Sequence, residues 1–484
     1  MRNDFLSLDA LSARVAAKAP AFRDLADRIW DFAELRFQEH RSSEAQIALL
    51  EAEGFRVTRG LGGLATAFVA EAGGGGPVIG LLGEFDALAG LSQEAGNPRP
   101  APLVAGGHGH GCGHNLLGAG AMLAAVAARD ALAEGGQPGT IRYYGCPAEE
   151  GGSGKTFMAR AGAFDDLDAA ISWHPGVFAG VNSARTLANF QVYFRFKGRP
   201  SHAAGSPHLG RSALDAVEIM NMGANSLREH MPSDARLHYA ITDTGGISPN
   251  VVQANAEVLY LIRSPKVAQA EALFARVRRC AEGAAHMTET ALTVELDKAC
   301  SEVLPNTVLE MAMHENIRRL GAPQFDEADR AFAHAIRESL TAEDIESSVE
   351  FFGAPAGAAA LSMAEEVLPF DGTPRFMPGS TDVGDVSWVV PTVQCHGANY
   401  AIGTPFHTWQ MVAQGKSPAA HKGMLHAAQA MAATALDAVR DPELLARAKA
   451  ELARRTGGKP YACPIPPEVV PPPLRAVAAR GPRA

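Results

Sequence analysis

The sequence predicts an α/β fold with a central mixed sheet, interrupted by a second, inserted domain. In both terminal parts of the chain, strand-like apolar runs alternate with helical patterns, which is typical of a sheet covered by helices on both faces. Residues 188–300 instead follow the order β-α-β-β-α-β, the ferredoxin-like pattern, which forms a compact unit by itself. We therefore expect a discontinuous first domain, 1–187 and 301–484, and an inserted domain, 188–300.

The N-terminal region predicts two helices. Over residues 21–38, the side chains of Phe22, Leu25 and Ile29 recur at helical spacing, which indicates an amphipathic helix. A second helix, capped by Ser42 or Ser43, is expected to end at Gly54, since serine favours the first position of a helix and glycine the position after its end.

The rest of the first domain supplies the strands of the expected sheet. Apolar strands are predicted at 67–72, 77–82, 140–146 and 169–173, with a buried helix from residue 116 to about residue 134. Polar side chains follow directly after several of these strands, where open α/β folds place their ligands.

The inserted unit and the C-terminal part differ in how much their sequences reveal. The unit predicts four strands and two helices, at 189–196, 236–242, 251–262 and 291–297, and at 211–230 and 267–287. Residues 324–378 contain a charged helix and a part rich in alanine, glycine and proline, and they receive no role from sequence. From Cys463 onward the chain is rich in proline, which predicts an extended strap or disorder.

Composition narrows the class of protein. The 484 residues are 47% hydrophobic and 20% charged, which is ordinary for a soluble globular protein, and the net charge of −10 disfavours a nucleic-acid partner. No apolar run reaches the roughly 18 residues of a membrane span, and the first residues lack the apolar core of an export signal. The six cysteines form no CxxC pair and suggest no disulfide framework, so we expect a cytoplasmic protein.

The strongest local signal is a glycine-rich stretch from residue 107 to 115. His108, His110, Cys112 and His114 lie within seven residues and are separated only by glycines. Imidazole and thiolate are ligands that zinc prefers, and glycine lets a tight loop bring such side chains together. Because a buried helix follows, the sequence predicts a metal site at a loop-to-helix junction.

Further candidates have ordinary structural explanations when they are taken one at a time. Asp86 suits a strand-end cap, the adjacent Glu149 and Glu150 suit solvated surface charges, and His174 and His407 suit buried, hydrogen-bonded histidines. Together they supply a set of donors after predicted strands or in glycine-rich loops, which indicates one site. Of two adjacent carboxylates, one can bind a metal while the other serves as general base.

Five motifs in fixed order carry a resemblance to a known family: Glu84-Phe85-Asp86-Ala87-Leu88, Cys112-Gly113-His114-Asn115, Pro147-Ala148-Glu149-Glu150-Gly151-Gly152, Gly379-Ser380-Thr381-Asp382-Val383 and Pro405-Phe406-His407. The series resembles the amidohydrolase branch of the co-catalytic metallopeptidases, which includes aminoacylases, carboxypeptidase G and plant auxin-conjugate hydrolases. The resemblance covers nearly the whole chain. It implies that the first domain is catalytic and that the insert is a lid and dimerisation domain.

The resemblance implies metal-dependent hydrolysis of the amide bond of an N-acyl amino acid, with p-aminobenzoyl-glutamate as the expected substrate. Other N-acyl amino acids, auxin-aspartate conjugates and dipeptides remain alternatives, as does a non-catalytic or regulatory subunit of a heteromeric hydrolase. The expected partner, joined through the lid, is either a second copy of the chain or a homologous subunit of another type, the A subunit of a heteromeric hydrolase.

The resemblance also assigns the metal ligands. Two divalent ions, zinc or manganese, are implied, and the matching residues are Cys112, His114, Glu150, His174 and His407. Five ligands suffice for two ions if one ligand bridges them and water fills the open positions. We expect Cys112 to be the bridge, because other members of the family use a bridging carboxylate near this point.

Other roles follow from the same motifs. Glu149 matches the general base, and Asp86 matches the acid that orients a metal-binding histidine. His202 matches a lid residue that stabilises the oxyanion, often in the active site of the partner copy. Asn250 and Arg263 match residues that hold the substrate carboxylate. Without the family, turn hydrogen bonds or a surface charge would explain all three lid residues.

Three departures from the family pattern stand out. Ala89 occupies a position where proline is usual, and Asn115 replaces an aspartate of the auxin-conjugate hydrolases, which suggests a distinct substrate subgroup. The segment 324–378 is absent from shorter relatives and is expected to shape the substrate pocket or to contact a partner. His108 and His110 become bystanders of the metal site.

Overall fold

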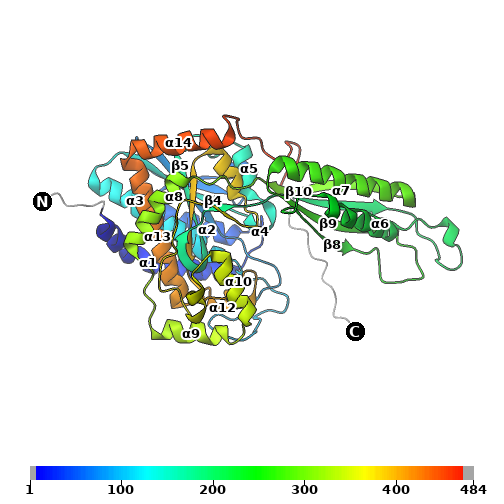
Figure 1. Cartoon of the computed structure of the whole chain (residues 1–484), viewed down its shortest axis with the longest axis horizontal. Helices are drawn as coiled ribbons and strands as arrows, with labels where there is room; N and C mark the ends of the chain where they lie inside the picture. Colours follow the sequence, from blue (N-terminus) through cyan, green and yellow to red (C-terminus); the bar gives the residue numbers. More distant parts are fainter. Residues whose placement is uncertain (1–6, 472–484) are drawn as a thin grey trace.

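The computed structural model describes residues 7–471 and places a six-stranded mixed sheet at the centre of the larger part of the molecule (Figure 1). The strand order is β1-β2-β4-β3-β5-β12, with β2 antiparallel to both neighbours and β3, β4, β5 and β12 parallel. The strands are β1 (Arg56–Arg59), β2 (Phe68–Gly74), β3 (Val78–Glu84), β4 (Gly139–Cys146), β5 (Ala169–Val181) and β12 (Thr392–Ala398).

Alternation along the central strands explains why helices cover both faces of this sheet. Leu81 and Tyr143 face one buried hydrophobic cluster, whereas their neighbours Leu82 and Tyr144 face the other. The first face is covered by α1 (Leu8–Phe32), α3 (His114–Gly135), α8 (Thr307–Leu320) and α13 (Pro418–Arg440). The second is covered by α5 (Gly154–Arg160) and α11 (Val383–Val389). The predicted α/β class is thereby confirmed.

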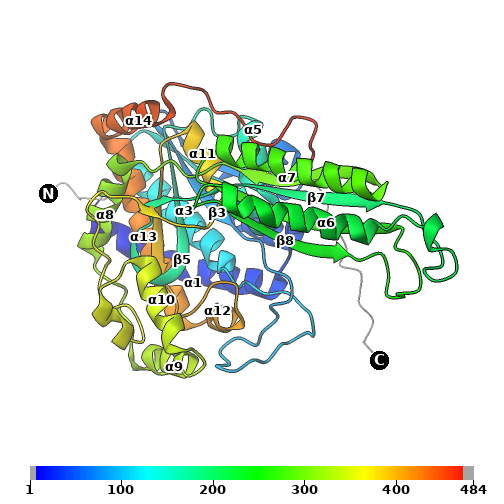
Figure 2. The ribbon, with the colours of Figure 1, turned by 45° about the vertical axis from the view of Figure 1, so that its right-hand side comes forward.

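Residues 188–300 form a separate four-stranded antiparallel sheet, which extends away from the first part (Figures 1 and 2). Its order is β10-β7-β9-β8, and helices α6 and α7 pack against it. The elements are β7 (Ala188–Lys197), α6 (Ala213–Ser226), β8 (Arg236–Asp243), β9 (Asn255–Ser264), α7 (Val267–Thr288) and β10 (Ala291–Cys300). The element order is the one that the sequence predicts, and β9 shows the regular alternation of buried and less buried residues that is typical of a strand.

The N-terminal helices differ from the prediction. Helix α1 runs from Leu8 to Phe32 and includes Pro20, so the predicted bounds 21–38 are wrong at both ends. Helix α2 (His40–Ala52) contains Ser42 and does not begin there. The carboxylate of Glu34 accepts hydrogen bonds from the first-turn amides of Arg41 and Ser42, and it therefore replaces a serine cap.

Strand β5 is longer than the predicted 169–173, and it changes its pairing beside Pro175. Residues 170–175 pair in parallel with 392–397, whereas Val177, Gly180 and Val181 meet β12 in the reverse order. The chain therefore turns close to the predicted strand end at residue 173, but it stays hydrogen-bonded to β12. His174 consequently sits where the strand bends rather than in a free loop.

Helix α3 corrects another expectation. It is long and apolar enough to cross a membrane, although no apolar run was expected to reach that length. However, 83% of its most apolar window is buried inside the protein, where the helix contacts α1, α13 and β3. It is therefore the central helix of the core.

The segment 324–378 packs beside the end of the sheet. It contains α9 (Glu327–Arg337), α10 (Ala342–Phe352), a short 3₁₀ turn (Ala356–Ala360) and β11 (Arg375–Phe376), which pairs with β6 (Ala184–Arg185). Both longer helices begin with a capping box, at Asp326 and at Thr341.

The C-terminal segment is partly described. After α14 (Pro442–Thr456), residues 463–471 form no helix or strand, and Arg160 donates to the carbonyls of Pro466 and Val469. This stretch is an extended strap over α5, as predicted. The remaining tail, 472–484, and the N-terminal residues 1–6 lie outside the described residues.

Candidate metal centre

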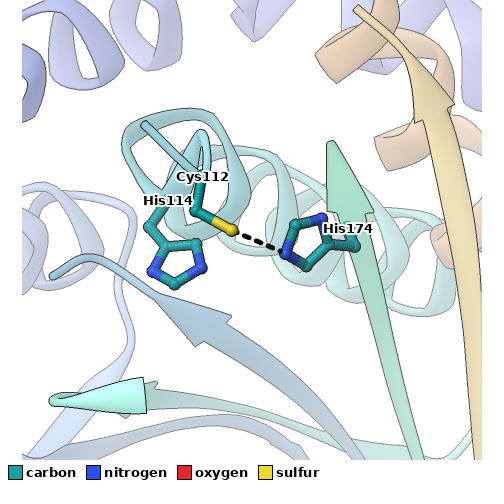
Figure 3. Close-up of side chains that lie close together, drawn as sticks. All are labelled: Cys112, His114 and His174. Atoms are coloured by element: carbon teal, nitrogen blue, oxygen red, sulfur yellow. Dashed lines mark hydrogen bonds between the residues drawn. The ribbon is translucent and has the colours of Figure 1, made fainter. Parts of the chain in front are cut away.

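Cys112 and His114 lie where the glycine-rich loop enters α3, and their side chains face His174 on β5 (Figure 3). Cys112 Sγ is 3.3 Å from His174 Nε2. Gly113 between them has φ +78°, and a Cβ there would lie 2.3 Å from Tyr400 Oη, so only glycine fits this tight turn. The local sequence thus brings a thiol and an imidazole to one point beside a third ligand from the sheet.

Hydrogen bonds fix the buried His114 and the partly buried His174. His174 Nδ1 donates to the carbonyl of Pro175 at 2.8 Å, which leaves Nε2 as the lone-pair nitrogen toward Cys112. His114 Nδ1 donates to Asp86 Oδ1 at 2.9 Å, so its Nε2, which lies 3.2 Å from Glu84 Oε2, is the nitrogen that a cation would contact.

Asp86 also holds the loop that carries the two glutamates. Its second oxygen, Oδ2, accepts the backbone N–H of Glu150 at 2.9 Å. One buried carboxylate therefore sets the position of His114 and of Glu150 together. This geometry agrees with the orienting role implied for Asp86.

Glu149 and Glu150 begin the short helix α4 (Glu149–Gly152), which follows β4. Ala148 before it has φ +61°, a left-handed conformation that costs about 1–3 kcal/mol in a residue other than glycine. The conformation is supported by Glu39, which accepts the Ala148 N–H at 2.9 Å, and by Lys298 of the inserted unit, which donates to Glu150 O at 3.2 Å. Backbone strain is therefore concentrated directly before the predicted base.

His407 completes the group from the C-terminal part of the chain. Its backbone also adopts a positive φ, +61°, and its N–H donates to Gly111 O at 2.8 Å. His407 Nε2 lies 3.3 Å from Glu150 Oε2, and the imidazole is 54% exposed. His407 thus stands at the mouth of the site, whereas His114 is fully buried.

The donor set fits divalent metal ions. Ligand atoms cluster within 4.8 Å of one another in three groups: Cys112, His114 and His174; Cys112, Glu150 and His407; and Glu84, His114 and Glu149. Cys112 and His114 each belong to two of these groups, and of the two the thiolate of Cys112 is the expected bridge. His114 Nε2 and Glu150 Oε1 are buried and make no hydrogen bond, so a cation would supply their missing partner.

The two adjacent glutamates have opposite electrostatic surroundings. Burial, followed by the charges of Glu84 and Glu150, raises the pKa of Glu149 well above its usual range. Burial also opposes ionisation of Glu150, but its hydrogen bond with His407 and the charge of His114 outweigh it and lower the pKa to about 2. Two carboxylates whose pKa values are shifted in opposite directions suit two roles, one as a charged ligand and one as a proton carrier.

The thiol of Cys112 is also prepared for metal binding. Burial and Glu150 act to raise its pKa, but His174 and His114 prevail and lower it to about 6. The thiolate is the form that binds metal.

A buried ion pair behind the site was missed by sequence analysis. Lys155 is fully buried, and its Nζ lies 2.6 Å from both Glu84 Oε1 and Asp382 Oδ1. Against the effect of burial, these two carboxylates raise the pKa of Lys155 well above its usual range, so the lysine stays charged. Both carboxylates, Glu84 and Asp382, stand in the motifs that carry the family resemblance, but no local pattern pairs them with Lys155.

A cavity of about 250 Å³ lies over this cluster. It is lined by Cys112, Glu149, Glu150, His174 and His407, and also by Arg263 from β9 of the inserted unit. Arg263 Nη1 donates to Ser380 Oγ at 2.7 Å, and its buried Nε has no hydrogen-bond partner. The predicted carboxylate-binding arginine therefore shares one cavity with the predicted base.

The other two lid residues lie elsewhere. His202 and Asn250 are exposed on the inserted unit, where the Ala203 N–H donates to Asn250 O and His202 Nδ1 accepts from Ala204 and Gly205. Neither residue lines the cavity of its own chain.

The structure also shows where the two bystander histidines, His108 and His110, and the two departures from the family pattern, Ala89 and Asn115, lie. His110 is buried, its Nε2 donates to Ile29 O at 3.0 Å, and burial lowers its pKa to about 3, whereas His108 is exposed. Ala89 lies in an exposed turn. Asn115 donates to the carbonyls of Ala26 and Gly415, which an ionised aspartate cannot do. These hydrogen bonds give the asparagine a structural role, and its link to a substrate subgroup stays a prediction.

Comparison with characterised proteins adds an independent line of observation. The chain is 52% identical over 95% of its length to the B subunit of p-aminobenzoyl-glutamate hydrolase from Escherichia coli, of which it covers 98%. It is 30% identical to a mouse Xaa-Arg dipeptidase, with 89% of each chain covered. The A subunit of the Escherichia coli hydrolase is 28% identical over 48% of this chain and 54% of its own.

Solved structures share the fold. An aminohydrolase from Staphylococcus aureus superposes with a TM-score of 0.60 at 16% identity, covering 90% of this chain and 100% of its own. A dinuclear metal-binding peptidase from Bacillus subtilis superposes with a TM-score of 0.53 at 19% identity, covering 89% and 99%. The sequence model of peptidase family M20/M25/M40 matches residues 80–469. The chain thus belongs to peptidase family M20/M25/M40 and is an amide-bond hydrolase.

Proposed function

We propose that this protein hydrolyses p-aminobenzoyl-glutamate to p-aminobenzoate and glutamate. The observation that carries the proposal is the convergence of four candidate metal ligands, a spare glutamate and an arginine on one cavity, with the fifth candidate, His114, grouped with Cys112 and His174 beside it. The 52% identity to the B subunit of the Escherichia coli hydrolase supports this substrate.

In this proposal Cys112, His114, Glu150, His174 and His407 hold two divalent ions, zinc or manganese, with Cys112 shared between them. When bound, such ions supply Lewis acidity and make water a stronger nucleophile at neutral pH. The dinuclear site named for the Bacillus subtilis relative supports the count of two. Cysteine and histidine favour zinc, whereas the glutamate also admits manganese.

Glu149 acts as the general base. It takes a proton from the attacking water and delivers it to the leaving nitrogen of glutamate when the amide bond breaks. Its raised pKa, caused first by burial, suits a group that must both accept and return a proton. Asp86 keeps His114 and the Glu149–Glu150 loop in position for this exchange.

Arg263 holds a carboxylate of the substrate. Its guanidinium is already oriented by Ser380, and arginine can pair with a carboxylate through two parallel hydrogen bonds. The unpartnered Nε of Arg263 supports this role because it leaves one donor available in a buried position.

The inserted unit, residues 188–300, serves as lid and dimerisation domain in this proposal. His202 and Asn250 complete the site of a partner, where His202 stabilises the oxyanion and Asn250 helps to hold the substrate carboxylate. Their exposure and their distance from their own cavity support action across an interface. The partner is a second copy or a homologous A subunit, which the similarity to the Escherichia coli A subunit supports. The six free cysteines support a cytoplasmic location.

Metal analysis combined with a hydrolysis screen tests the proposal. The purified chain is loaded with zinc or manganese, its metal content is measured, and release of the free acid is followed with p-aminobenzoyl-glutamate, N-acetyl-glutamate, an indole-acetyl-aspartate and an Xaa-Arg dipeptide. About two ions per chain and fastest turnover of p-aminobenzoyl-glutamate are expected.

Two outcomes would replace the proposal. Preferred cleavage of the dipeptide would favour the second candidate, a dipeptidase, which the 30% identity to the mouse enzyme suggests. Full metal binding without turnover of any substrate, restored only by a homologous A subunit, would make this chain a non-catalytic or regulatory component.

A further inference from the structure

An aromatic cluster lies next to the metal-facing side chains. Phe351 and Phe352 at the end of α10 approach Phe406, with ring centroids 6.2 and 6.3 Å apart. Phe406 also meets His174 edge to face at 5.6 Å, and Phe352 meets His396 at 4.9 Å. The rings therefore continue from a predicted metal ligand outward to the segment 324–378.

Part of this cluster is open toward the cavity. Phe351, Phe406 and His396 line the same 250 Å³ space as Glu149 and Arg263. Phe351 is 43% exposed, whereas its neighbour Phe352 is only 8% exposed and packs in the core. A large apolar ring left partly open beside polar catalytic groups indicates a surface for an apolar part of a ligand.

At the edge of this aromatic region, one buried polar atom lacks a hydrogen-bond partner. His396 Nδ1 is buried without a hydrogen-bond partner, and the side chains of Asn182 and Gln394 line the same cavity. These groups offer hydrogen bonds at the edge of the aromatic surface. A ligand with a ring and a small polar substituent matches such a lining better than a plain alkyl group does.

The cavity wall is held in place before any ligand binds. Arg337 of α9 donates to the carbonyls of Ala359, Leu361 and Ile402, and Arg375 donates to Glu350 O beside Phe351. These contacts attach the segment 324–378 to the loop that precedes His407. The aromatic side chains thus come from the α/β part, whereas Arg263 comes from the inserted unit.

We propose that Phe351, Phe406 and His396 form the subsite for the acyl group of the substrate, and that Phe351 selects aromatic over short aliphatic acyl groups. This inference rests on the proposed hydrolysis of an acyl-glutamate. Aromatic rings bury a large area and prefer offset or edge-to-face contacts, which the arrangement of Phe351 and Phe406 offers. In this proposal the segment 324–378 has a function, because it supplies the Phe351 ring that contacts the acyl group.

The test compares Phe351→Ala with a matched control, Phe376→Ala. Phe376 lies in the same segment and is also 43% exposed, but it does not line the cavity. For each metal-loaded variant, kcat/KM is measured with p-aminobenzoyl-glutamate and with N-acetyl-glutamate. Binding of p-aminobenzoate and of acetate is measured by calorimetry, which does not depend on turnover.

We expect Phe351→Ala to lower kcat/KM for the aromatic substrate about tenfold and to change the acetyl substrate less than about twofold, with weaker binding of p-aminobenzoate. Phe376→Ala should leave both substrates unchanged. Equal losses for both substrates, or unchanged p-aminobenzoate binding in Phe351→Ala, would overturn the subsite. Failure of the wild type to cleave any acyl-glutamate would instead overturn the proposed function, and with it the acyl preference.

Discussion

The metal-facing cluster and the tip of the inserted unit differ in how far one chain determines their geometry. Around the cluster, His114 and the Glu150 N–H donate hydrogen bonds to Asp86, and His174 donates one to the Pro175 carbonyl. At the tip, His202 and Asn250 are exposed and lie in two loops that bond to each other through the Ala203 N–H and the Asn250 carbonyl. The side chains of the first region are held by contacts within one chain, whereas the two residues of the second region are exposed.

The difference separates two parts of catalysis that can be tested independently. The proposed metal ligands and the proposed base are positioned by the fold of one chain, so the loss of one of them should lower activity within a single chain. Oxyanion stabilisation by His202 should depend on assembly.

The largest effect is expected from Glu149→Gln. The amide keeps the size of the side chain but cannot accept the proton of water, so turnover should fall about 10²–10⁴-fold. Steady-state hydrolysis of p-aminobenzoyl-glutamate measures the change, with metal content as the control. A variant that keeps two ions and near wild-type turnover would remove Glu149 from the role of base.

The second-largest effect is expected for His202, at the exposed tip of the inserted unit. His202→Ala should lower kcat about 10²–10³-fold, the cost of losing one oxyanion donor. If His202 acts on the partner copy, mixing this variant with Glu149→Gln restores about a quarter of the activity, since half of the dimers are mixed and each has one intact site. Co-refolded mixtures measure the recovery, and its absence would place His202 in its own site or outside catalysis.

Asp86→Asn tests the fixed region without touching a ligand. Loss of the carboxylate that orients His114 should weaken metal affinity about 10–100-fold. Competition with a chelator measures the affinity, and the expected order is wild type above Asp86→Asn. An unchanged affinity would make Asp86 only a support of the Glu150 loop.

The smallest effect is expected at Glu39, beneath the strained Ala148. Burial and the charge of Asp86 raise its pKa to about 8, so folding favours the protonated form. Its contribution to stability is therefore present below the unfolded pKa, near 4.5, and is lost as pH rises toward 8. Glu39→Gln, which mimics the protonated form, should match the wild type at pH 5 and melt about 2–4 °C higher at pH 8. Thermal denaturation across this range measures the difference, and parallel curves would contradict the assignment.

Sequence periodicity predicted the inserted unit better than the helices at the N-terminus. Strand β9 alternates between buried and less buried residues along its whole length, so it was readable from spacing alone. The start of α2 was misassigned because its first amides are bound by Glu34, which precedes the helix by several residues. Long-range capping of this kind leaves no local pattern.

The candidate site likewise contains residues that the sequence identified and residues that it missed. Cys112, His114 and Glu149–Glu150 stand in motifs whose spacing suggests chemistry. By contrast, Lys155 looks like a surface lysine in the sequence, and its burial between Glu84 and Asp382 depends on residues more than two hundred positions apart. Phe351 likewise gave no signal, because its neighbour Phe406 approaches only after the segment 324–378 has folded against the sheet.

The sequence by itself determined the α/β class, the inserted domain and the residue types of the metal centre, because periodicity, glycine spacing and donor chemistry are local properties. Only the tertiary structure decided which groups meet: Cys112 at the overlap of two ligand groups, Asp86 between His114 and Glu150, and Arg263 and Phe351 in one cavity. The physical reason is that these contacts join elements far apart in the chain. Their distances are fixed by the packing of the sheet and its helices and not by any neighbouring residue.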